Sequence, residues 1–314
     1  EELSIGESEG SEEYMFQEVT GIAVNAEGNI YVVDYEAKHV KVFDKHGRHM
    51  KTFGKPGEGP GEFQLPRTIE CAPWDEIILG DINRITYFDL EGEYKKNLPM
   101  SRVRLLGLQH DTDGNILGLV IDRENEVYSL QKFDKDLNFL NSFASSPLPS
   151  SGEYRNKRSL FFSVLRWDML NDRQVVCGYA GEGYVIKVFD ETGTMIRRIE
   201  KEFDPVEVDQ KEAEEQLKDM PAEVRDSYFA PKTYPPFRTV SADDQGRIYV
   251  ITYEKTPDEI GYMFDVFDTE GVYIAEIHLK SRPRLFKNDR MYTVEEDEDG
   301  FHVVKRYRIG WNLQ

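Results

Sequence analysis

Two arginines at equivalent places in the sequence could recognise an anionic group. Arg67 stands in "PRTI" and Arg238 in "FRTV", and each opens a strand-like run. A guanidinium offers a planar fork of N–H donors that fits a carboxylate, a sulfate or a partner side chain. Asp81 falls on the strand expected beside Arg67. This pair therefore either belongs to a ligand site or forms a salt bridge that ties two strands together.

Aromatic side chains are the second set of candidate contacts. A run rich in tyrosine, phenylalanine and proline contains Tyr228, Phe229 and Tyr234 and ends at Phe237. Rigid rings of this kind provide large contact areas. The run therefore either covers a ligand or partner site, or packs on the body of the protein. Trp167, in "RWD", is a further candidate contact, with core packing as its alternative.

The glycine-rich stretch "FGKPGEGPGEF", at 53–63, raises the question of phosphate binding. Glycines that follow a strand cradle phosphates when they lead into a helix. Here the stretch leads into "FQLPRTIECA", where Pro66 and the β-branched residues favour a strand. No Lys-Ser or Lys-Thr pair follows Gly61. We therefore interpret the stretch as a connection between two β-units.

Motifs for catalysis or metal binding are missing from the sequence. The six histidines show no HExxH spacing, and no serine lies in a G-x-S-x-G motif. Cys71 and Cys177 are too few for a disulfide framework and are not spaced for zinc. Turns such as "DTDGN" lack the further oxygen ligands of a calcium loop. We predict no catalytic residue, no metal and no cofactor.

The charge balance limits the class of partner. The chain has 59 Asp and Glu against 39 Lys and Arg, a formal net charge of −20. Such a surface repels phosphate backbones and anionic membranes, so we expect no nucleic-acid partner. No stretch of the sequence approaches the roughly 18 consecutive apolar residues of a membrane span. A lipid anchor remains compatible with this composition.

A repeated pair of hairpins must position these residues. Its first half is clearest in "GIAVNAEGNIYVVDY" and its second half in "VKVFDKHGRHMKTF". The Phe-Asp of the second half recurs along the chain, and the intervals between successive aspartates are 45, 45, 56 and 78 residues. The aspartates are Asp44, Asp89, Asp134, Asp190 and Asp268. A unit of about 45 residues with four short strands has the size of one propeller blade.

The repeats predict an all-β protein, a six-bladed β-propeller of four-stranded antiparallel blades that forms a single domain over residues 1–314. The last unit has room for three strands, so the N-terminal "LSIG" is expected to close it as the fourth. The two longer intervals correspond to insertions at about 144–162 and 201–237. Helix formers in "DPVEVDQKEAEEQLKDM" predict a helix in the second insertion, between blades four and five.

The stretch "GIAVNAEGNIYVVDYEAKHVKVFDKHGRHMKTFG" resembles the NHL-type repeats of six-bladed β-propellers. The resemblance implies a binder of protein, carbohydrate or RNA, and more rarely a lyase or hydrolase. In such repeats the aspartate of "YVVD", here Asp34, commonly accepts hydrogen bonds from nearby backbone amides. Many bacterial members look exported or lipid-anchored and have no assigned role. The chain begins at Glu1 rather than methionine, which either signal cleavage or trimming of the sequence would explain. The resemblance therefore implies a periplasmic, cell-surface or secreted protein.

These observations favour a non-catalytic propeller that binds a protein or a glycan through its long loops. The expected contacts are Arg67, Asp81, Arg238, Trp167 and the aromatic residues near Tyr228–Phe237. Two alternatives remain open. One is a hydrolase or lyase with a carboxylate-held metal at the mouth of the propeller, and the other is self-assembly into a larger structure.

Overall fold

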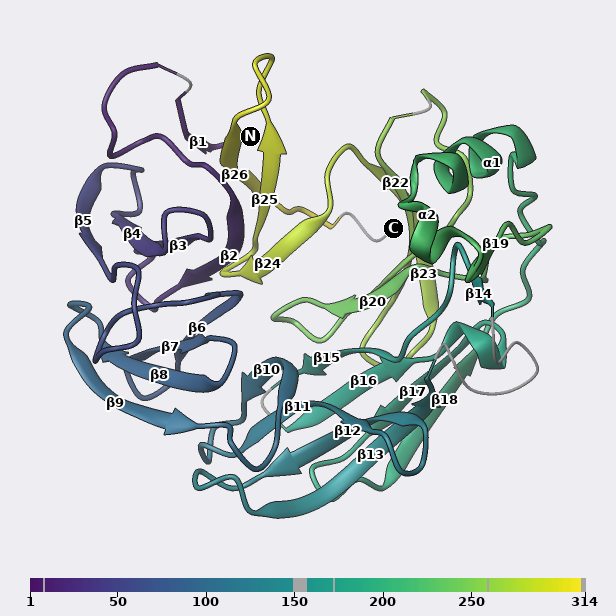
Figure 1. The fold of residues 1–314 in the computed structure, drawn as a ribbon, viewed down its shortest axis with the longest axis horizontal. Coiled ribbons are helices and arrows are strands. Elements are labelled where there is room, and N and C mark those ends of the chain that lie inside the picture. The colour runs from purple at the N-terminus through teal and green to yellow at the C-terminus, as the bar shows by residue number, and fades with distance from the viewer. Residues whose placement is uncertain (8, 149–156, 172, 259, 312–314) are drawn as a thin grey trace. The chain divides into compact units, whose positions relative to one another are not determined.

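The chain folds into six four-stranded sheets, the blades of a six-bladed β-propeller (Figure 1). This computed structural model describes residues 1–7, 9–148, 157–171, 173–258 and 260–311. In blades one to five, each strand pairs with the next strand along the chain. The prediction of an all-β propeller with six blades is confirmed.

The first three blades are built from consecutive strands. Blade one contains β2 (Val19–Val24), β3 (Ile30–Asp34), β4 (His39–Phe43) and β5 (His49–Phe53). Blade two contains β6 (Thr68–Ala72), β7 (Glu76–Gly80), β8 (Arg84–Asp89) and β9 (Tyr94–Pro99). Blade three contains β10 (Leu105–His110), β11 (Ile116–Asp122), β12 (Val127–Phe133) and β13 (Phe139–Pro147).

The last three blades follow the same pattern until the final strand. Blade four contains β15 (Arg166–Leu170), β16 (Gln174–Gly178), β17 (Val185–Phe189) and β18 (Met195–Glu200), with the 3-10 helix η1 (Ala180–Glu182) between β16 and β17. Blade five contains β20 (Thr239–Ala242), β21 (Ile248–Ile251), β22 (Tyr262–Phe267) and β23 (Tyr273–Leu279). Blade six contains β24 (Pro283–Lys287), β25 (Arg290–Glu296), β26 (His302–Arg308) and β1 (Leu3–Ile5).

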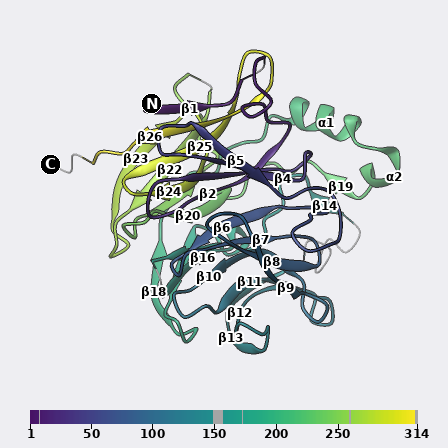
Figure 2. The ribbon, with the colours of Figure 1, turned by 90° about the vertical axis from the view of Figure 1, so that its left-hand side faces the viewer.

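The N-terminal strand completes the last blade. Strand β1 pairs antiparallel with β26, with Leu3 opposite Arg306 and Ile5 opposite Val304, and Figure 2 shows the two strands side by side. Ile5 is 2% exposed and packs in the core cluster that also contains Val304. Burial of this side chain therefore supports the closure predicted from "LSIG", at about 1.5–3 kcal/mol for a fully buried isoleucine.

Tight turns hold the hairpins in register. In the turn after β4, the Asp44 carboxylate accepts hydrogen bonds from the amides of His46 and Arg48 at 2.8 and 2.9 Å. Gly47 has a φ of 81°, which an L-residue adopts only with strain. The corresponding turn of blade three instead contains Leu137, with a φ of 61°. Blade three therefore carries strain at a position that glycine fills in blade one.

The chain divides into two compact units. Unit one contains residues 1–118, 133–139 and 281–314, and unit two contains residues 119–132 and 140–280. Unit one has a core between blades one and two, where Tyr31 and Val33 meet Ile77 and Leu79. Unit two has a core between blades four and five, made by the inward side chains of β16, β17, β20 and β21. Each core forms because adjacent sheets bury their apolar faces against each other.

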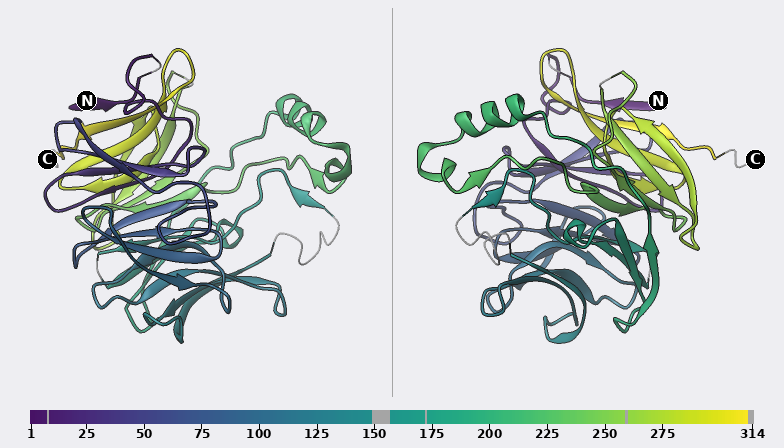
Figure 3. Two further views of the ribbon diagram at one scale, coloured as in Figure 1. Left: turned by 60° about the vertical axis from the view of Figure 1, so that its left-hand side comes forward. Right: turned by 90° about the vertical axis from the view of Figure 1, so that its right-hand side faces the viewer.

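The two insertions meet in unit two. Strand β14 (Arg158–Ser159) pairs parallel with β19 (Tyr228–Phe229), and the second insertion also contains α1 (Gln210–Asp219) and α2 (Ala222–Arg225). Figure 3 shows both helices at the end of extended segments, beyond the strands of blade five. We call residues 157–162 and 201–237 the insertion lobe.

The predicted limits of the insertions are partly revised. The helix expected within 204–220 is confirmed as α1, which Asp209 caps through the amides of Lys211 and Glu212. Residues 144–147 are not part of an insertion, because β13 continues to Pro147. Residues 149–156 of the first predicted insertion lie outside the described residues.

Candidate functional site

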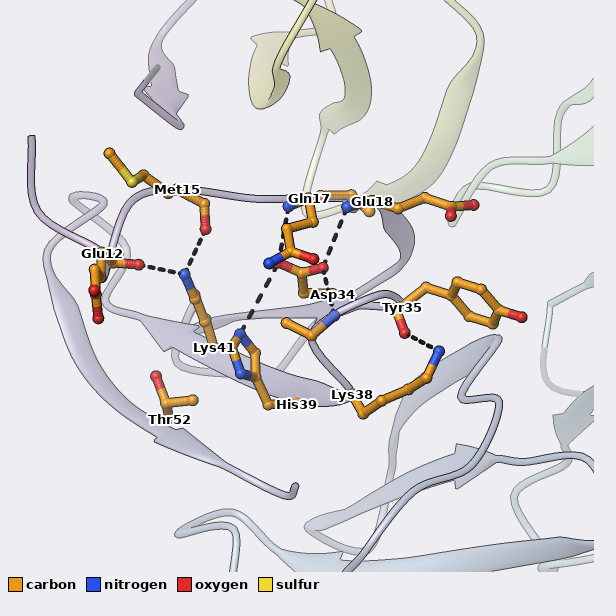
Figure 4. A network of polar contacts seen from close by, with 12 residues as sticks. Glu12, Met15, Gln17, Glu18, Asp34, Tyr35, Lys38, His39, Lys41 and Thr52 are labelled. Carbon is orange, nitrogen blue, oxygen red and sulfur yellow. Dashed lines mark hydrogen bonds and ion pairs between the residues drawn. The ribbon is translucent and has the colours of Figure 1, made fainter. Parts of the chain in front are cut away.

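Asp34 fixes the segment that enters blade one. Its carboxylate accepts hydrogen bonds from the amides of Gln17 and Glu18 at 3.0 and 3.2 Å, and from Ala37 at 3.3 Å (Figure 4). Asp34 is only 1% exposed, so these amides replace water around the buried charge. The prediction that Asp34 accepts backbone hydrogen bonds is confirmed.

Lys41 holds the same entering segment from the other side. Its ammonium group donates to the carbonyl oxygens of Glu12 and Met15, both at 2.5 Å (Figure 4). Burial lowers the pKa of Lys41, and the nearby Asp34 carboxylate opposes that shift. The network therefore clamps the segment that enters blade one.

Asp81 has the corresponding structural role in blade two. Its carboxylate accepts from the amides of Gln64 and Leu65 at 2.9 and 2.6 Å, and from Ile82 at 2.8 Å. The cation nearest to it in an ion pair is Arg84, with Nε 3.7 Å from Oδ2. Asp81 is 5% exposed. The Asp81 carboxylate therefore holds the segment that enters blade two.

Arg67 lies apart from Asp81. In the described part of the chain no ion pair joins them, so the salt bridge considered from the sequence is not formed. The exposed Arg67 guanidinium instead lies over the ring of Tyr35, 5.9 Å from its centroid. The Arg67 amide donates to the carbonyl of Gly80, which fixes the start of β6.

The glycine-rich stretch 53–63 binds a carboxylate of the protein itself. Glu62 Oε2 accepts from the Gly59 amide at 2.8 Å, and Oε1 lies 3.3 Å from the Lys55 ammonium. A Cβ on Gly57 would lie 2.0 Å from the Glu62 carboxylate. The Gly59 amide and Lys55 together lower the pKa of Glu62. Glu62 thus occupies the position that a phosphate would need, and the connection joins β5 to β6 as predicted.

Arg238 is the centre of the candidate site in unit two. Its guanidinium lies over the ring of Tyr253, 4.2 Å from the centroid, and 5.8 Å from that of Tyr262. The Arg238 amide donates to the carbonyl of Ile251, which places the side chain just before β20. Arg238 is exposed, and no carboxylate of the described residues pairs with it. The two rings therefore orient a guanidinium whose N–H donors face solvent.

A stack of aromatic rings supports Tyr253. Tyr234 stacks on it with a centroid distance of 4.5 Å and an interplanar angle of 15°. Phe161 contacts Tyr234 at 4.6 Å and lies at 57° to it. Phe161 and Tyr234 belong to the insertion lobe, so the lobe is joined to blade five through these rings. Burial raises the pKa of both tyrosines, which keeps their hydroxyls neutral.

The remaining predicted aromatic residues build the framework around the stack. Tyr228 and Phe229 form β19 and are half-buried, and the Phe229 carbonyl accepts from the Leu160 amide at 2.8 Å. Trp167 is half-buried in β15, opposite Cys177. Successive side chains of a strand point to opposite faces, so Trp167 and its neighbour Arg166 face apart. Of the predicted contacts, Arg238 and Tyr234 lie together, because both lie against the ring of Tyr253.

A second polar cluster in unit two fixes the base of the lobe. Asp265 is completely buried and accepts from Lys201 Nζ at 2.8 and 2.9 Å and from the Tyr184 hydroxyl at 2.5 Å. Beside it, burial and a hydrogen bond with the Glu276 carboxyl raise the pKa of Glu254. Lys201 is the first residue of the second insertion. The ion pair therefore holds the lobe where it leaves β18.

Unit one contains a buried series of hydrogen-bonded titratable side chains that the sequence did not reveal. His110 contacts the Glu70 carboxylate through Nδ1 and the Tyr87 hydroxyl through Nε2, the latter at 3.1 Å. Trp74 lies edge-on to the imidazole at 6.0 Å. His110 is 8% exposed and Tyr87 4%, so this series of side chains lies within the protein.

Among the described residues, no group of three or more His, Cys, Asp or Glu is placed to hold a metal ion.

Comparison with known proteins supports the fold. A family model described as a 6-bladed beta-propeller matches residues 9–141. A candidate exported protein of Bacteroides fragilis NCTC 9343 is similar in structure, with 12% identity and a TM-score of 0.62, over 96% of this chain and 93% of that chain. No curated protein matches the sequence. The match does not specify the NHL type of repeat, which stays a prediction.

Two enzymes have similar structures. A gluconolactonase of Xanthomonas campestris has 13% identity and a TM-score of 0.51, over 93% of this chain and 87% of that chain. A luciferin-regenerating enzyme has 13% identity and a TM-score of 0.52, over 94% and 93%. At these identities the similarity is one of fold alone.

In the part of the chain that the structure describes, neither helix has the length and hydropathy of a membrane span.

Proposed function

We propose that the protein is a non-catalytic binding module that recognises a protein or a glycan through the surface around Arg238. The observation that carries this proposal is the Arg238 guanidinium, which is exposed, oriented by two tyrosine rings and free of a carboxylate partner among the described residues. Orientation lowers the entropy that a long side chain loses when it binds a ligand. A ligand therefore gains most of the hydrogen-bond energy of the guanidinium.

The groups around Arg238 suit binding better than catalysis. The Tyr234 and Tyr253 hydroxyls stay neutral at physiological pH, since burial raises both pKa values. Neutral phenols donate and accept hydrogen bonds but are poor nucleophiles and bases. The insertion lobe adds the aromatic surface of Phe161 next to them.

Binding to an array of glycans and to candidate partner proteins tests the proposal. We expect Arg238→Ala to lower the affinity for the bound ligand at least tenfold. The matched control is Arg197→Ala in the same unit, because Arg197 already pairs with Glu270 and the Thr269 carbonyl. Equal affinity of the two variants would overturn the placement of the site. Failure of the wild-type protein to bind anything would overturn the function.

We also propose that the protein acts outside the cytoplasm, in the periplasm, on the cell surface or as a secreted protein. The structural similarity to a candidate exported protein supports this location. Fractionation of the source cells, with an antibody against the protein, tests it. Recovery in the cytosolic fraction would contradict the proposal.

A further inference from the structure

A second arginine lies beside Arg238 at the candidate site. Arg166 is the first residue of β15, and Arg238 directly precedes β20. The two strands are adjacent, since the Asp168 carboxylate accepts from the Ala242 amide at 2.9 Å. Arg166 and Arg238 both act electrostatically on the Tyr253 hydroxyl, where their positive charges lower a pKa that burial raises. Arg238 therefore lies against Tyr253, and Arg166 is near enough to the same hydroxyl to act on it electrostatically.

Neither arginine pairs with a carboxylate in the described part of the chain. No carboxylate among the described residues forms an ion pair with Arg166 or Arg238, although the chain has 59 acidic residues against 39 basic ones. Other arginines of unit two are paired, such as Arg197 with Glu270 and Arg247 with Asp243. In so acidic a protein, two guanidinium groups on adjacent strands that have no carboxylate partner among the described residues form a local positive site.

Arg166 is partly desolvated while it stays accessible. The residue as a whole is exposed, yet burial of its guanidinium by the surrounding protein lowers the pKa of Arg166. The groups that oppose this shift are the Tyr253 and Tyr128 hydroxyls rather than carboxylates. Partial desolvation strengthens the attraction to an incoming anion, because less water must be displaced and the local dielectric is lower. A negatively charged ligand would therefore stabilise the charged form of the Arg166 guanidinium.

We propose that Arg166 and Arg238 together bind the carboxylate of an acidic sugar, a uronic acid residue of a glycan. This inference rests on the proposed binding function and names the class of its ligand. A carboxylate accepts two parallel hydrogen bonds from a guanidinium, which is the strongest geometry available to the pair. The neutral Tyr253 hydroxyl near the arginines adds a donor for a ring oxygen or hydroxyl.

The charge of the whole chain selects among anionic ligands. Repulsion from a net charge of −20 increases with the charge of the ligand, so a glycan with one or a few uronic acid residues is favoured over a nucleic acid, a polysulfated glycan or a strongly acidic protein. The sugar ring of a uronic acid presents C–H groups and hydroxyls beside its carboxylate. These groups fit the phenol rings of Tyr253 and Tyr262 that lie against Arg238.

The test compares charged and neutral forms of the same ligand. Oligomers of galacturonic, glucuronic and mannuronic acid, and the methyl esters of each, are titrated into the full chain at low salt. We expect at least one free acid to bind at least tenfold more tightly than its ester, with an affinity that falls as salt is added. Arg166→Gln and Arg238→Gln should each remove this preference, and Arg238→Lys should restore part of it. Thermal melting of each variant confirms that it is folded.

Other outcomes overturn the recognition of a uronic acid and distinguish its failure from failure of the proposed binding function. Equal binding of acid and ester, or full binding by both glutamine variants, refutes recognition of the carboxylate. If a neutral glycan binds and depends on Arg238 but not on Arg166, the binding function stands and the uronic acid is rejected. If a glutamate-rich peptide binds more tightly than every sugar acid, the ligand is a protein. Absence of binding to all uronic acids also rejects the proposal.

Discussion

In blades one, two and five, the polar residue at the end of the second strand matches the backbone that faces it. Asp34 and Asp81 accept from the amides that lie 17 and 16 residues before them. At the equivalent position of blade five stands Thr252, and the residues 17 and 16 before it are Pro235 and Pro236. Proline has no amide hydrogen, so a carboxylate at this position would lack the two backbone donors that Asp34 and Asp81 have. Threonine is therefore the residue that suits blade five.

Exchanging the two residue types tests this match. We expect Asp81→Thr to lower the free energy of unfolding by about 1–3 kcal/mol, because buried amides lose their acceptor. Thr252→Asp should also destabilise, by a similar amount, because Pro235 and Pro236 give the new carboxylate no amide donors. Urea denaturation measures both. The exposed Asp258→Thr is the control, and a Thr252→Asp variant as stable as the wild type would contradict the explanation.

Glu254 predicts a dependence of stability on pH. Its pKa is raised in the folded state, so the folded protein binds this proton more tightly than the unfolded chain. The contribution is present at low pH and is lost as the pH rises through the folded-state pKa. We expect Glu254→Gln to melt at a higher temperature than the wild type at pH 7. The gain in free energy of unfolding should be less than about 1 kcal/mol, because the pair of Glu254 and Glu276 is partly exposed.

The advantage of Glu254→Gln should shrink at pH 4, where the wild-type carboxyl is protonated. Melting curves at both values of pH measure the difference. Glu270→Gln, which removes an exposed carboxylate of the same unit, serves as the control. A difference that stays the same at both values would show that charge repulsion is not its cause.

Leu137 gives a prediction in the stabilising direction. Its φ of 61° is left-handed, and a non-glycine residue in this region costs about 1–2 kcal/mol. Leu137→Gly should therefore raise the free energy of unfolding by about 1 kcal/mol, since glycine adopts this conformation without strain. Leu137→Ala keeps the strain and is the matched control. Thermal melting that ranks the glycine variant below the alanine variant would refute the prediction.

At the scale of the elements, short-range patterns determine the blades but not the contacts between long loops. The Phe-Asp turns and the glycine hairpins made the strands and the closing role of β1 predictable. The pairing of β14 with β19 was not, because two residues in each strand leave no periodic pattern. Arg166 was also missed, since its position depends on Tyr253 in another blade rather than on a local motif.

The closing strand is the element whose loss should matter most. Removing residues 1–6 exposes the backbone donors and acceptors of β26 and uncovers Val304, which is 1% exposed. We expect a lower melting temperature and concentration-dependent aggregation, because free strand edges pair with other chains. Ile5→Asp should destabilise in the same direction while it keeps the chain length. Light scattering and thermal melting measure both effects, and a monomeric deletion variant of unchanged stability would contradict this role.

At the scale of the whole molecule, the division into two units raises the question of cooperativity. Strands β11 and β12 each contain residues of both units. A strand cannot keep half of its hydrogen bonds in a stable form when the other half unfolds. The prediction of a single domain over 1–314 therefore implies a single cooperative transition.

Urea unfolding followed by two probes tests this prediction. Trp74 reports on unit one and Trp167 on unit two, so variants that keep one of these tryptophans, with Trp311 replaced by phenylalanine, separate the signals. We expect coincident transitions at all urea concentrations. Two separated midpoints would show that the units unfold independently and that residues 1–314 form more than one domain.

The parallel pair β14 and β19 makes two parts of the chain that are distant in sequence depend on each other. The segments that form it are separated in sequence by the whole of blade four, yet each supplies one strand of the pair and one ring of the stack that supports Tyr253. A change in the length of either segment would displace the other. Transfer of the candidate site to another propeller would therefore require both segments at once, and relatives should gain or lose them together.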